Sequence, residues 1–263
     1  MPHTVRVEDI GNECVLQQLD HLMLDNTFGL RMQVIFQLQN LTYIHMHRSV
    51  LNIHGISLLP CLSTLVLTEC VVKDDVDSAA CIFSPSLEAI YSQNTDYYSP
   101  HTVELFHSDV TSLYLTAHWS MDPRAHFTET SHLYPFSSTL LELVLKCDER
   151  NPHDFVNFRS LCRLVTLVVC NTPYMSLDTL LLPPTLLNLS IQGEWVINDQ
   201  ICQMAFSTLT VLHLECHLEF KHIGLSRLSR LRRLSILAPS ELHSRLLPPP
   251  DVLEEFVIHT FEK

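Results

Sequence analysis

Glycine is scarce in this sequence: only 5 occur among 263 residues, and no two of them lie close together. Phosphate-binding loops and dinucleotide-binding fingerprints need several glycines in one short turn, so neither can be built here. The nucleophile elbow GxSxG, the zinc motif HExxH and the protein-kinase signatures are missing as well. These gaps predict a protein that is not an enzyme and that holds no cofactor and no metal.

The sequence also has few charged residues, and few Lys and Arg in particular. Charged residues make up 17% of the chain, against a usual share of about a quarter. The 16 Lys and Arg face 29 Asp and Glu, which gives −13 with His neutral. Because nucleic acids are bound mainly through Lys and Arg, we expect no binding of nucleic acid or of a membrane surface. One basic cluster, Arg227, Arg230, Arg232 and Arg233, is interpreted as a solvated face.

Paired cysteines and long apolar runs are also missing. The 9 cysteines are scattered, with no CxxC pair and no cluster at either end, which favours reduced thiols over a disulfide framework. The N-terminus lacks the charged-then-apolar pattern of a signal peptide. No uncharged apolar run reaches the ~18 residues of a membrane span. We therefore expect an intracellular protein, in the cytoplasm or the nucleus.

What the sequence has instead is a recurring leucine pattern, LxxLxL. The clearest copies are residues 62–67, 186–191, 209–214 and 231–236. Looser copies begin at Leu19, Leu41, Leu87, Val110, Leu140, Leu164 and Leu253. The eleven starts are 23.4 residues apart on average, and nine of the ten intervals lie between 21 and 25 residues. Such regularity is a strong sign of a repeat protein.

This pattern resembles the leucine-rich-repeat family, whose consensus is LxxLxLxxN/C, over roughly residues 14 to 263. The resemblance implies an α/β-type repeat solenoid of the short-repeat class: a leucine-rich-repeat horseshoe with a parallel concave β-sheet of about 11 strands. In the family, the ninth position ties down the turn after the strand. Here it is filled acceptably by Cys70 and Asp148, less well by Ser49, Thr95, Thr172 and Glu194, and not by His118, His217 or Pro239.

Alternation along each strand predicts which side chains are buried. The consensus apolar residues face inward, and stacking of neighbouring repeats buries them. The expected core is a ladder of Leu65, Leu113, Leu143, Leu167, Leu189, Leu212 and Leu234. Many return limbs end in proline, which lacks an N–H and ends helices. We therefore expect mostly irregular or 3₁₀ limbs on the convex side.

The repeats occupy nearly the whole chain. Residues 1–13 are interpreted as an N-terminal cap or flank, and residues 14–263 as the repeat domain. The fifth repeat is longer than the others, with an insertion within residues 116–135 that is either a tolerated surface loop or a border of the binding face. No polar cap follows the last strand, so either a partner covers this end or the natural protein continues beyond Lys263.

The outward strand positions predict a binding surface. The middle column of the expected sheet contains no charged residue and is unusually apolar for a monomer surface. Our hypothesis is a partner-binding patch of Tyr43, His45, Tyr91 and Tyr114, roofed by Trp119 in the insertion. The alternative is that aromatic and β-branched residues simply suit strands.

Histidine-based sites are a weaker hypothesis. His21, His45 and His47 are expected to face the same way on two neighbouring strands, where they could bind a metal or sense pH. A second group combines His213, Cys216, His217 and His222. Ordinary surface histidines explain both groups better, so no metal site is predicted.

A repeat surface without catalytic motifs is typical of a binding protein. We expect a non-catalytic scaffold or a subunit of a larger intracellular assembly. Its protein partners would bind the concave face and also the uncapped C-terminal end. The alternative is the substrate-recognition part of a ubiquitin ligase of the F-box type, whose adaptor or catalytic domain lies outside this chain.

Overall fold

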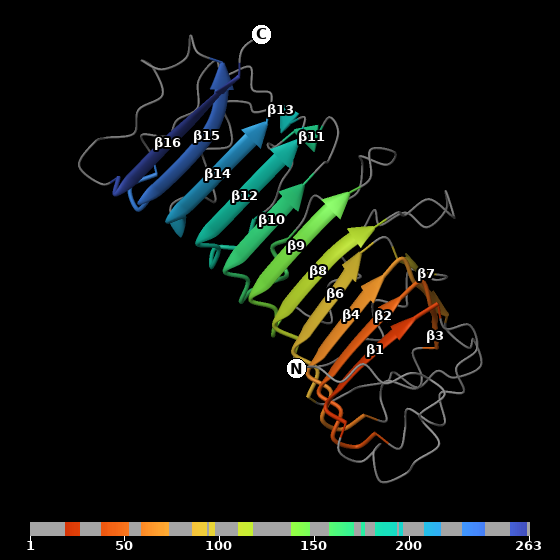
Figure 1. Cartoon of the computed structure of the whole chain (residues 1–263). Helices are drawn as coiled ribbons and strands as arrows, with labels where there is room; N and C mark the ends of the chain where they lie inside the picture. The colour runs from red at the N-terminus through yellow and green to blue at the C-terminus, as the bar shows by residue number, and fades with distance from the viewer. Residues whose placement is uncertain are drawn as a thin grey trace. The chain divides into compact units, whose positions relative to one another are not determined.

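The computed structural model describes fourteen segments of the chain: 19–26, 38–52, 59–73, 86–93, 95–97, 110–117, 138–147, 158–170, 175–176, 182–193, 195–196, 208–216, 228–239 and 253–261. The chain divides into two compact units, the first made mainly of residues 1–125 and the second mainly of residues 141–263. Both units are built on a ladder of parallel strands (Figure 1).

Unit 1 contains five strands of the main ladder, one from each repeat. They are β1 (His21–Asp25), β2 (Tyr43–His47), β4 (Thr64–Thr68), β6 (Ala89–Gln93) and β8 (Ser112–Ala117). Each strand pairs in parallel with the next, residue for residue. The middle outward column across the strands is therefore formed by Met23, His45, Val66, Tyr91 and Tyr114.

Unit 2 contains six strands in the same arrangement. They are β9 (Glu142–Cys147), β10 (Thr166–Cys170), β12 (Asn188–Gly193), β14 (Val211–Cys216), β15 (Arg233–Pro239) and β16 (Glu255–Phe261). Together with unit 1 this gives the eleven repeat strands that the leucine spacing predicts. In both units every connection between neighbouring strands passes through the rest of a repeat, as parallel pairing requires.

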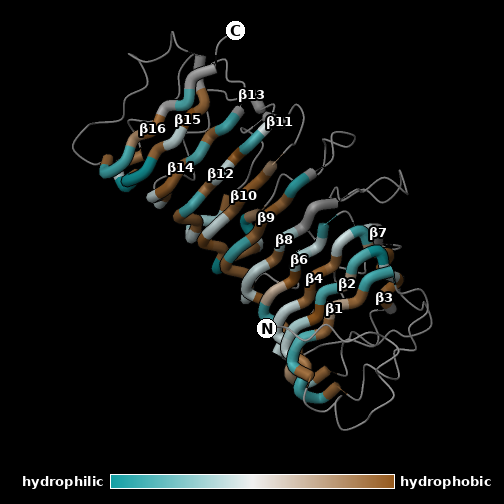
Figure 2. Tube along the Cα trace, in the orientation of Figure 1, coloured by the Kyte–Doolittle hydropathy of each residue, from teal (hydrophilic) through white to brown (hydrophobic). Residues whose placement is uncertain are grey.

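The core is the predicted leucine ladder. On β2, β4 and β10 burial alternates residue by residue, and the residues facing inward are almost completely buried. Figure 2 shows hydrophobic residues recurring on the strands of both units. All seven predicted ladder residues are buried: Leu65, Leu113, Leu143, Leu167, Leu189, Leu212 and Leu234. Ser92 is an exception, a buried polar residue at a consensus apolar position of β6.

A tight turn leads into several of the strands. In this turn the first consensus leucine donates its N–H to the carbonyl three residues earlier, for example Leu41 to Leu38 at 3.1 Å and Leu231 to Leu228 at 3.1 Å. Both leucines of each pair are buried. The turn therefore brings two apolar side chains into the core before the strand begins.

A repeated backbone contact joins each turn to the one before it. The carbonyl of Asp20 accepts the N–H groups of both Thr42 and Tyr43, at 2.9 and 3.1 Å. The same two-donor contact recurs at the start of β4, β6, β8, β10, β12, β14, β15 and β16. Because each such carbonyl is paired twice, the starts of these strands carry a hydrogen-bonded edge within each unit.

Short strands form a second layer of pairing after the main strands. In unit 1 they are β3 (Val50–Asn52), β5 (Val71–Lys73) and β7 (Asp96–Tyr97), and in unit 2 they are β11 (Met175–Ser176) and β13 (Trp195–Val196). Leu51 on β3 and Val72 on β5 are buried. The described limbs are thus partly extended, and the sequence pattern did not predict this second pairing.

In three repeats of unit 1, the ninth consensus position is occupied by a small buried residue that can donate a hydrogen bond. Ser49 Oγ donates to the carbonyl of His47 at 2.8 Å, and Thr95 Oγ1 donates to the carbonyl of Gln93 at 3.2 Å. Cys70 Sγ lies 3.3 Å from the carbonyl of Thr68. Ser49 and Thr95, rated as weaker by the consensus, therefore make the same turn contact as Cys70.

The last repeats depart from the consensus turn. Pro239, which does not fit the ninth position, is the final residue of β15 and pairs in register with Phe261 of β16. The strand therefore continues through the place where other repeats turn. The remaining ninth positions, at 118, 148, 172, 194 and 217, lie outside the described residues.

Several predictions on chain organisation also fall outside the described residues. These are the cap at residues 1–13 and all of the insertion except Thr116 and Ala117, which belong to β8. Within the described segments, no helix is long and apolar enough to cross a membrane.

Candidate functional site: the outward face of unit 1

The outward face of unit 1 is organised in three columns that run across its five strands. The middle column is Met23, His45, Val66, Tyr91 and Tyr114, as the sequence predicts. Met23 is 44% exposed and Tyr91 is 37% exposed, so the column keeps large side chains in contact with solvent at these two positions. This column holds three of the residues predicted to bind a partner.

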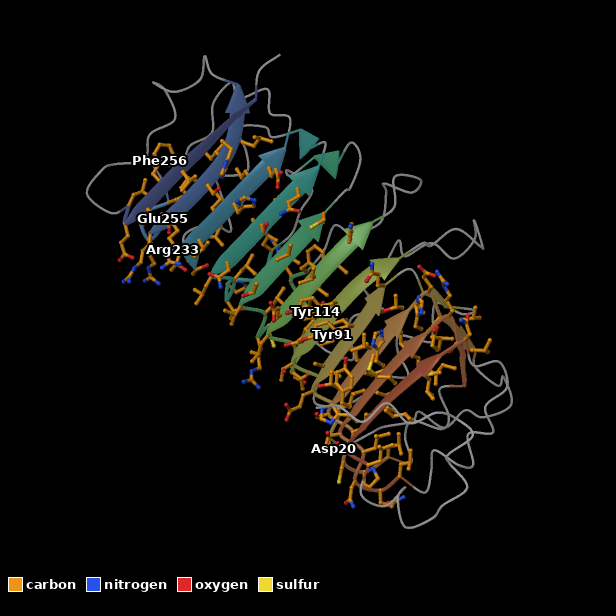
Figure 3. The ribbon with its side chains drawn as sticks, viewed as in Figure 1. Asp20, Tyr91, Tyr114, Arg233, Glu255 and Phe256 are labelled. Carbon is orange, nitrogen blue, oxygen red and sulfur yellow. The ribbon has the colours of Figure 1, made fainter. Side chains whose placement is uncertain are left out.

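Tyr91 and Tyr114 form the most pronounced feature of the column. Their rings come from the neighbouring strands β6 and β8 and stack with centroids 4.4 Å apart and planes 15° from parallel (Figure 3). In-register neighbours on parallel strands stand about 4.8 Å apart, so the pairing of the strands brings the two rings within stacking distance. Stacked aromatic pairs contribute about 0.5–1.5 kcal/mol beyond the area that they bury. The pair therefore forms a flat platform whose rings restrain one another.

Tyr43 lies elsewhere on the face. It belongs to the column nearest the start of the strands, where its ring stacks on His21 with centroids 5.3 Å apart. The whole of β4, with Thr64 and Val66, separates β2 from Tyr91 on β6. The predicted single patch is thus two stacked pairs linked through the middle column, and the His21–Tyr43 pair was not anticipated.

His45 connects β2 to β4 through its side chain. Its Nε2 lies 3.3 Å from Thr68 Oγ1 on the next strand. Partial burial, and secondarily the nearby His47, hold the pKa of His45 below its ordinary value. The imidazole is therefore held mainly in its neutral form near pH 7. Trp119, the remaining predicted residue, lies outside the described residues.

A charged group that the sequence reasoning missed lies where β1, β2 and β4 end. His47 Nδ1 is 2.9 Å from Asp25 Oδ1, and its Nε2 is 3.7 Å from Glu69 Oε2. Arg48 Nε donates to the same Glu69 oxygen at 2.8 Å. This contact, with the associated charge attraction, lowers the pKa of Glu69 and raises that of Arg48. Four polar side chains thus join three repeats.

The backbone places these charges. Asn26, Arg48 and Glu69 follow the three strands with φ of 51°, 47° and 51°, in the left-handed region that residues other than glycine seldom adopt. The N–H of each donates to the carbonyl of the last residue of the next main strand, for example Arg48 to Thr68 at 3.0 Å. In the sequence, this charged group is marked only by a polar residue directly after each of the three strands. These positions lie outside the middle column.

The first histidine group, His21, His45 and His47, forms no metal site in the part of the chain that the structure describes, whereas part of the second group lies outside it. No cluster of three or more His, Cys, Asp or Glu side chains there could hold a metal ion. His21 is engaged with Tyr43 and with Asp20, at 3.0 Å from Asp20 Oδ1. His217 and His222 of the second group lie outside the described residues.

The outward face of unit 2 has a different character. Its middle column holds Val144, Val168, Ser190, His213, Ser235 and Val257. At the start of its last strands, Arg232 pairs with Glu254 at 3.4 Å and Arg233 with Glu255 at 3.5 Å. Figure 3 labels Arg233 and Glu255 on β15 and β16. Two of the predicted basic residues are thus balanced by carboxylates of the next repeat.

Comparison with solved structures identifies the fold. A leucine-rich-repeat protein from Leptospira interrogans has a TM-score of 0.52 and 17% sequence identity, over 98% of this chain and 75% of that chain. The chain has the leucine-rich-repeat fold. This confirms the predicted fold class, with its parallel repeat strands. No protein-family model and no curated protein sequence matches the chain.

Two other leucine-rich-repeat structures are also similar to this chain. TLR13, solved in a complex with ssRNA13, gives a TM-score of 0.47 at 17% identity over 94% of this chain. The plant peptide hormone receptor RGFR1, solved in complex with RGF2, gives 0.37 at 12% identity over 94% of this chain. The chain spans only 43% of the first of these proteins and 53% of the second.

Proposed function

We propose that this leucine-rich-repeat chain is a non-catalytic interaction module that binds a protein partner on the outward face of unit 1. The binding residues are Tyr91 and Tyr114 at the centre, with Tyr43 and His45 towards β1. Trp119, from the insertion that follows β8, belongs to the same proposed surface. An intracellular scaffold or assembly subunit remains the expected setting.

The stacked Tyr91–Tyr114 pair, in which Tyr91 is exposed and Tyr114 is half-buried, is the observation that carries this proposal. Tyrosine is enriched among the residues that dominate binding energy at interfaces. Burying a large aromatic side chain that is already held in place costs little conformational entropy. The described middle column of unit 1 contains no charged side chain, so a partner can cover it without desolvating an ion.

The proposal can be tested by affinity capture with quantitative mass spectrometry. We compare the wild-type chain with the double variant Tyr91→Ala/Tyr114→Ala. The matched control is Val144→Ala/Val168→Ala, at the same column positions on the adjacent strands β9 and β10. We expect a defined set of captured proteins to be lost with the tyrosine variant and kept with the valine variant.

Equal capture by all three proteins would contradict binding through this face. Far-ultraviolet circular dichroism and thermal melting verify that each variant is folded. The single variants Tyr91→Phe and Tyr114→Phe provide a further check, because they keep the stacked rings and remove only the hydroxyl groups. We expect both to retain capture.

A further inference from the structure

Unit 1 is the more acidic of the two units, because it has 14 Asp and Glu against 5 Lys and Arg, whereas unit 2 has 15 against 11. On the main ladder of unit 1 there are four carboxylates, Asp20, Asp25, Glu69 and Glu88, and a single guanidinium, Arg48, which gives −3 with His neutral. Among the described residues of unit 2 the carboxylates of Glu142, Glu215, Glu254 and Glu255 face six cations, Lys146, Arg159, Arg163, Arg230, Arg232 and Arg233, which gives +2. The aromatic platform thus lies in the more acidic unit.

One of these carboxylates lies close to the platform along the same strand. Glu88 is exposed and directly precedes β6, three residues before Tyr91. A strand rises about 3.3 Å per residue, so the backbones of the two residues are separated by about 10 Å along the direction of β6. At the other end of β6, the N–H of Glu69 donates to the carbonyl of Gln93 at 2.8 Å. The carboxylate of Glu69 is paired with Arg48, so Glu88 is the described carboxylate that lies at an end of β6.

The chemistry of the platform favours a cation. The face of a tyrosine ring is electron-rich and attracts a guanidinium or ammonium group. Tyr91 is 37% exposed, so part of its ring can be reached by such a group from solvent. The single cation described on this ladder, Arg48, is held by Glu69 at 2.8 Å. Among the described side chains of unit 1, the negative charge is thus only partly neutralised.

Extending the proposed function, we propose that the partner presents an extended basic segment to this face. One arginine or lysine of the segment stacks on the Tyr91–Tyr114 platform, and a second, three residues away, meets the carboxylate of Glu88. In an extended polyproline-type chain, residues three apart lie on the same side at a separation of about 9 Å. That spacing matches the separation of Tyr91 and Glu88 along β6.

The test uses a short fluorescent peptide with arginine at every third position, separated by proline and serine. Its affinity for the full chain is measured by fluorescence anisotropy. The comparison peptides carry glutamine in place of arginine, or the same arginines placed side by side. We expect the regularly spaced arginine peptide to bind most tightly and to lose affinity as ionic strength rises.

Variants of the chain locate the contact. Tyr91→Ala is expected to raise the Kd for the arginine peptide about fivefold, whereas Tyr91→Phe keeps the ring and leaves the Kd within about twofold. Glu88→Gln is expected to raise the Kd about threefold. The control is Glu254→Gln, at the equivalent repeat position before β16, which should leave the Kd unchanged. Glu88 is exposed, so its variant tests the proposal without disturbing the core.

Three outcomes would overturn the proposal. The first is equal binding of the arginine and glutamine peptides. The second is absence of arginine-peptide binding while protein capture still depends on the tyrosine pair, in which case the proposed function stands and only the basic partner is wrong. The third is concentration-dependent self-association that Tyr91→Ala abolishes, measured by light scattering, because a second copy would then occupy the face.

Discussion

Cys70 Sγ lies 3.2 Å from the main-chain carbonyl oxygen of Met46 and donates its hydrogen one repeat back along the solenoid. Both residues are buried, and Thr95 makes the equivalent contact with the carbonyl of Leu67 at 3.4 Å. A buried carbonyl without a donor lowers stability. These small side chains therefore do more than fill space, because they satisfy backbone groups at the turns that end β2, β4 and β6.

We predict that Cys70→Ala lowers the free energy of unfolding by about 1–2 kcal/mol, since it removes a donor and leaves a small cavity. Cys70→Ser should lower it less, because serine supplies a hydroxyl donor, as Ser49 does at the equivalent position one repeat earlier. Urea denaturation followed by circular dichroism measures both. An alanine variant as stable as the serine variant would show that the thiol contact does not matter.

Thiol reactivity should separate the described cysteines into two classes. Cys61 and Cys162 are exposed, whereas Cys70 is buried and Cys170 is half-buried. Burial raises the pKa of both the Cys70 and the Cys170 thiol, and the thiolate is the form that reacts. We predict alkylation by iodoacetamide about tenfold or more slower at Cys70 than at Cys61, measured by peptide mass spectrometry. Equal rates under native conditions would mean that this turn opens readily.

His45 should make stability depend on pH. Its pKa is lowered in the folded chain, chiefly by partial burial and secondarily by His47. The unfolded chain therefore takes up a proton at a higher pH than the folded chain does. Stability is fully present above the ordinary histidine pKa and is lost as pH falls through the folded value.

Replacement of His45 tests this sign. We predict that His45→Gln, which stays neutral and can still reach Thr68, loses less stability than the wild type between pH 7 and pH 5. Chemical denaturation at a series of pH values gives the comparison. Histidine titration by nuclear magnetic resonance gives the pKa directly, and a His45 value above the ordinary range would refute the prediction.

Two consecutive leucines provide a matched test of whether the position within LxxLxL decides which side chain is buried. Leu186 is completely buried, whereas its neighbour Leu187 is 38% exposed. We predict that Leu186→Ala lowers the free energy of unfolding by about 3–5 kcal/mol through lost burial and a residual cavity. Leu187→Ala should change it by about 0.5 kcal/mol or less. Similar losses for both variants would mean that the leucine pattern does not set which face is buried.

The sequence by itself determined the number of repeat strands, the phase of each strand and the membership of the middle column. These follow from local information, because alternation within LxxLxL decides which side chains turn inward, and the equal phase of successive repeats aligns their outward residues. The middle column from Met23 to Tyr114 could therefore be identified from the sequence alone.

Only the tertiary structure decided which outward groups meet. The stack of Tyr91 on Tyr114, the pairing of Tyr43 with His21 and the ion pair of Arg48 with Glu69 depend on side-chain rotamers and on left-handed turn residues. Their partners lie more than twenty residues away in the chain and touch because neighbouring repeats are packed side by side. A repeat pattern fixes where backbones run, but contacts between surface side chains are settled by packing and by competition with water.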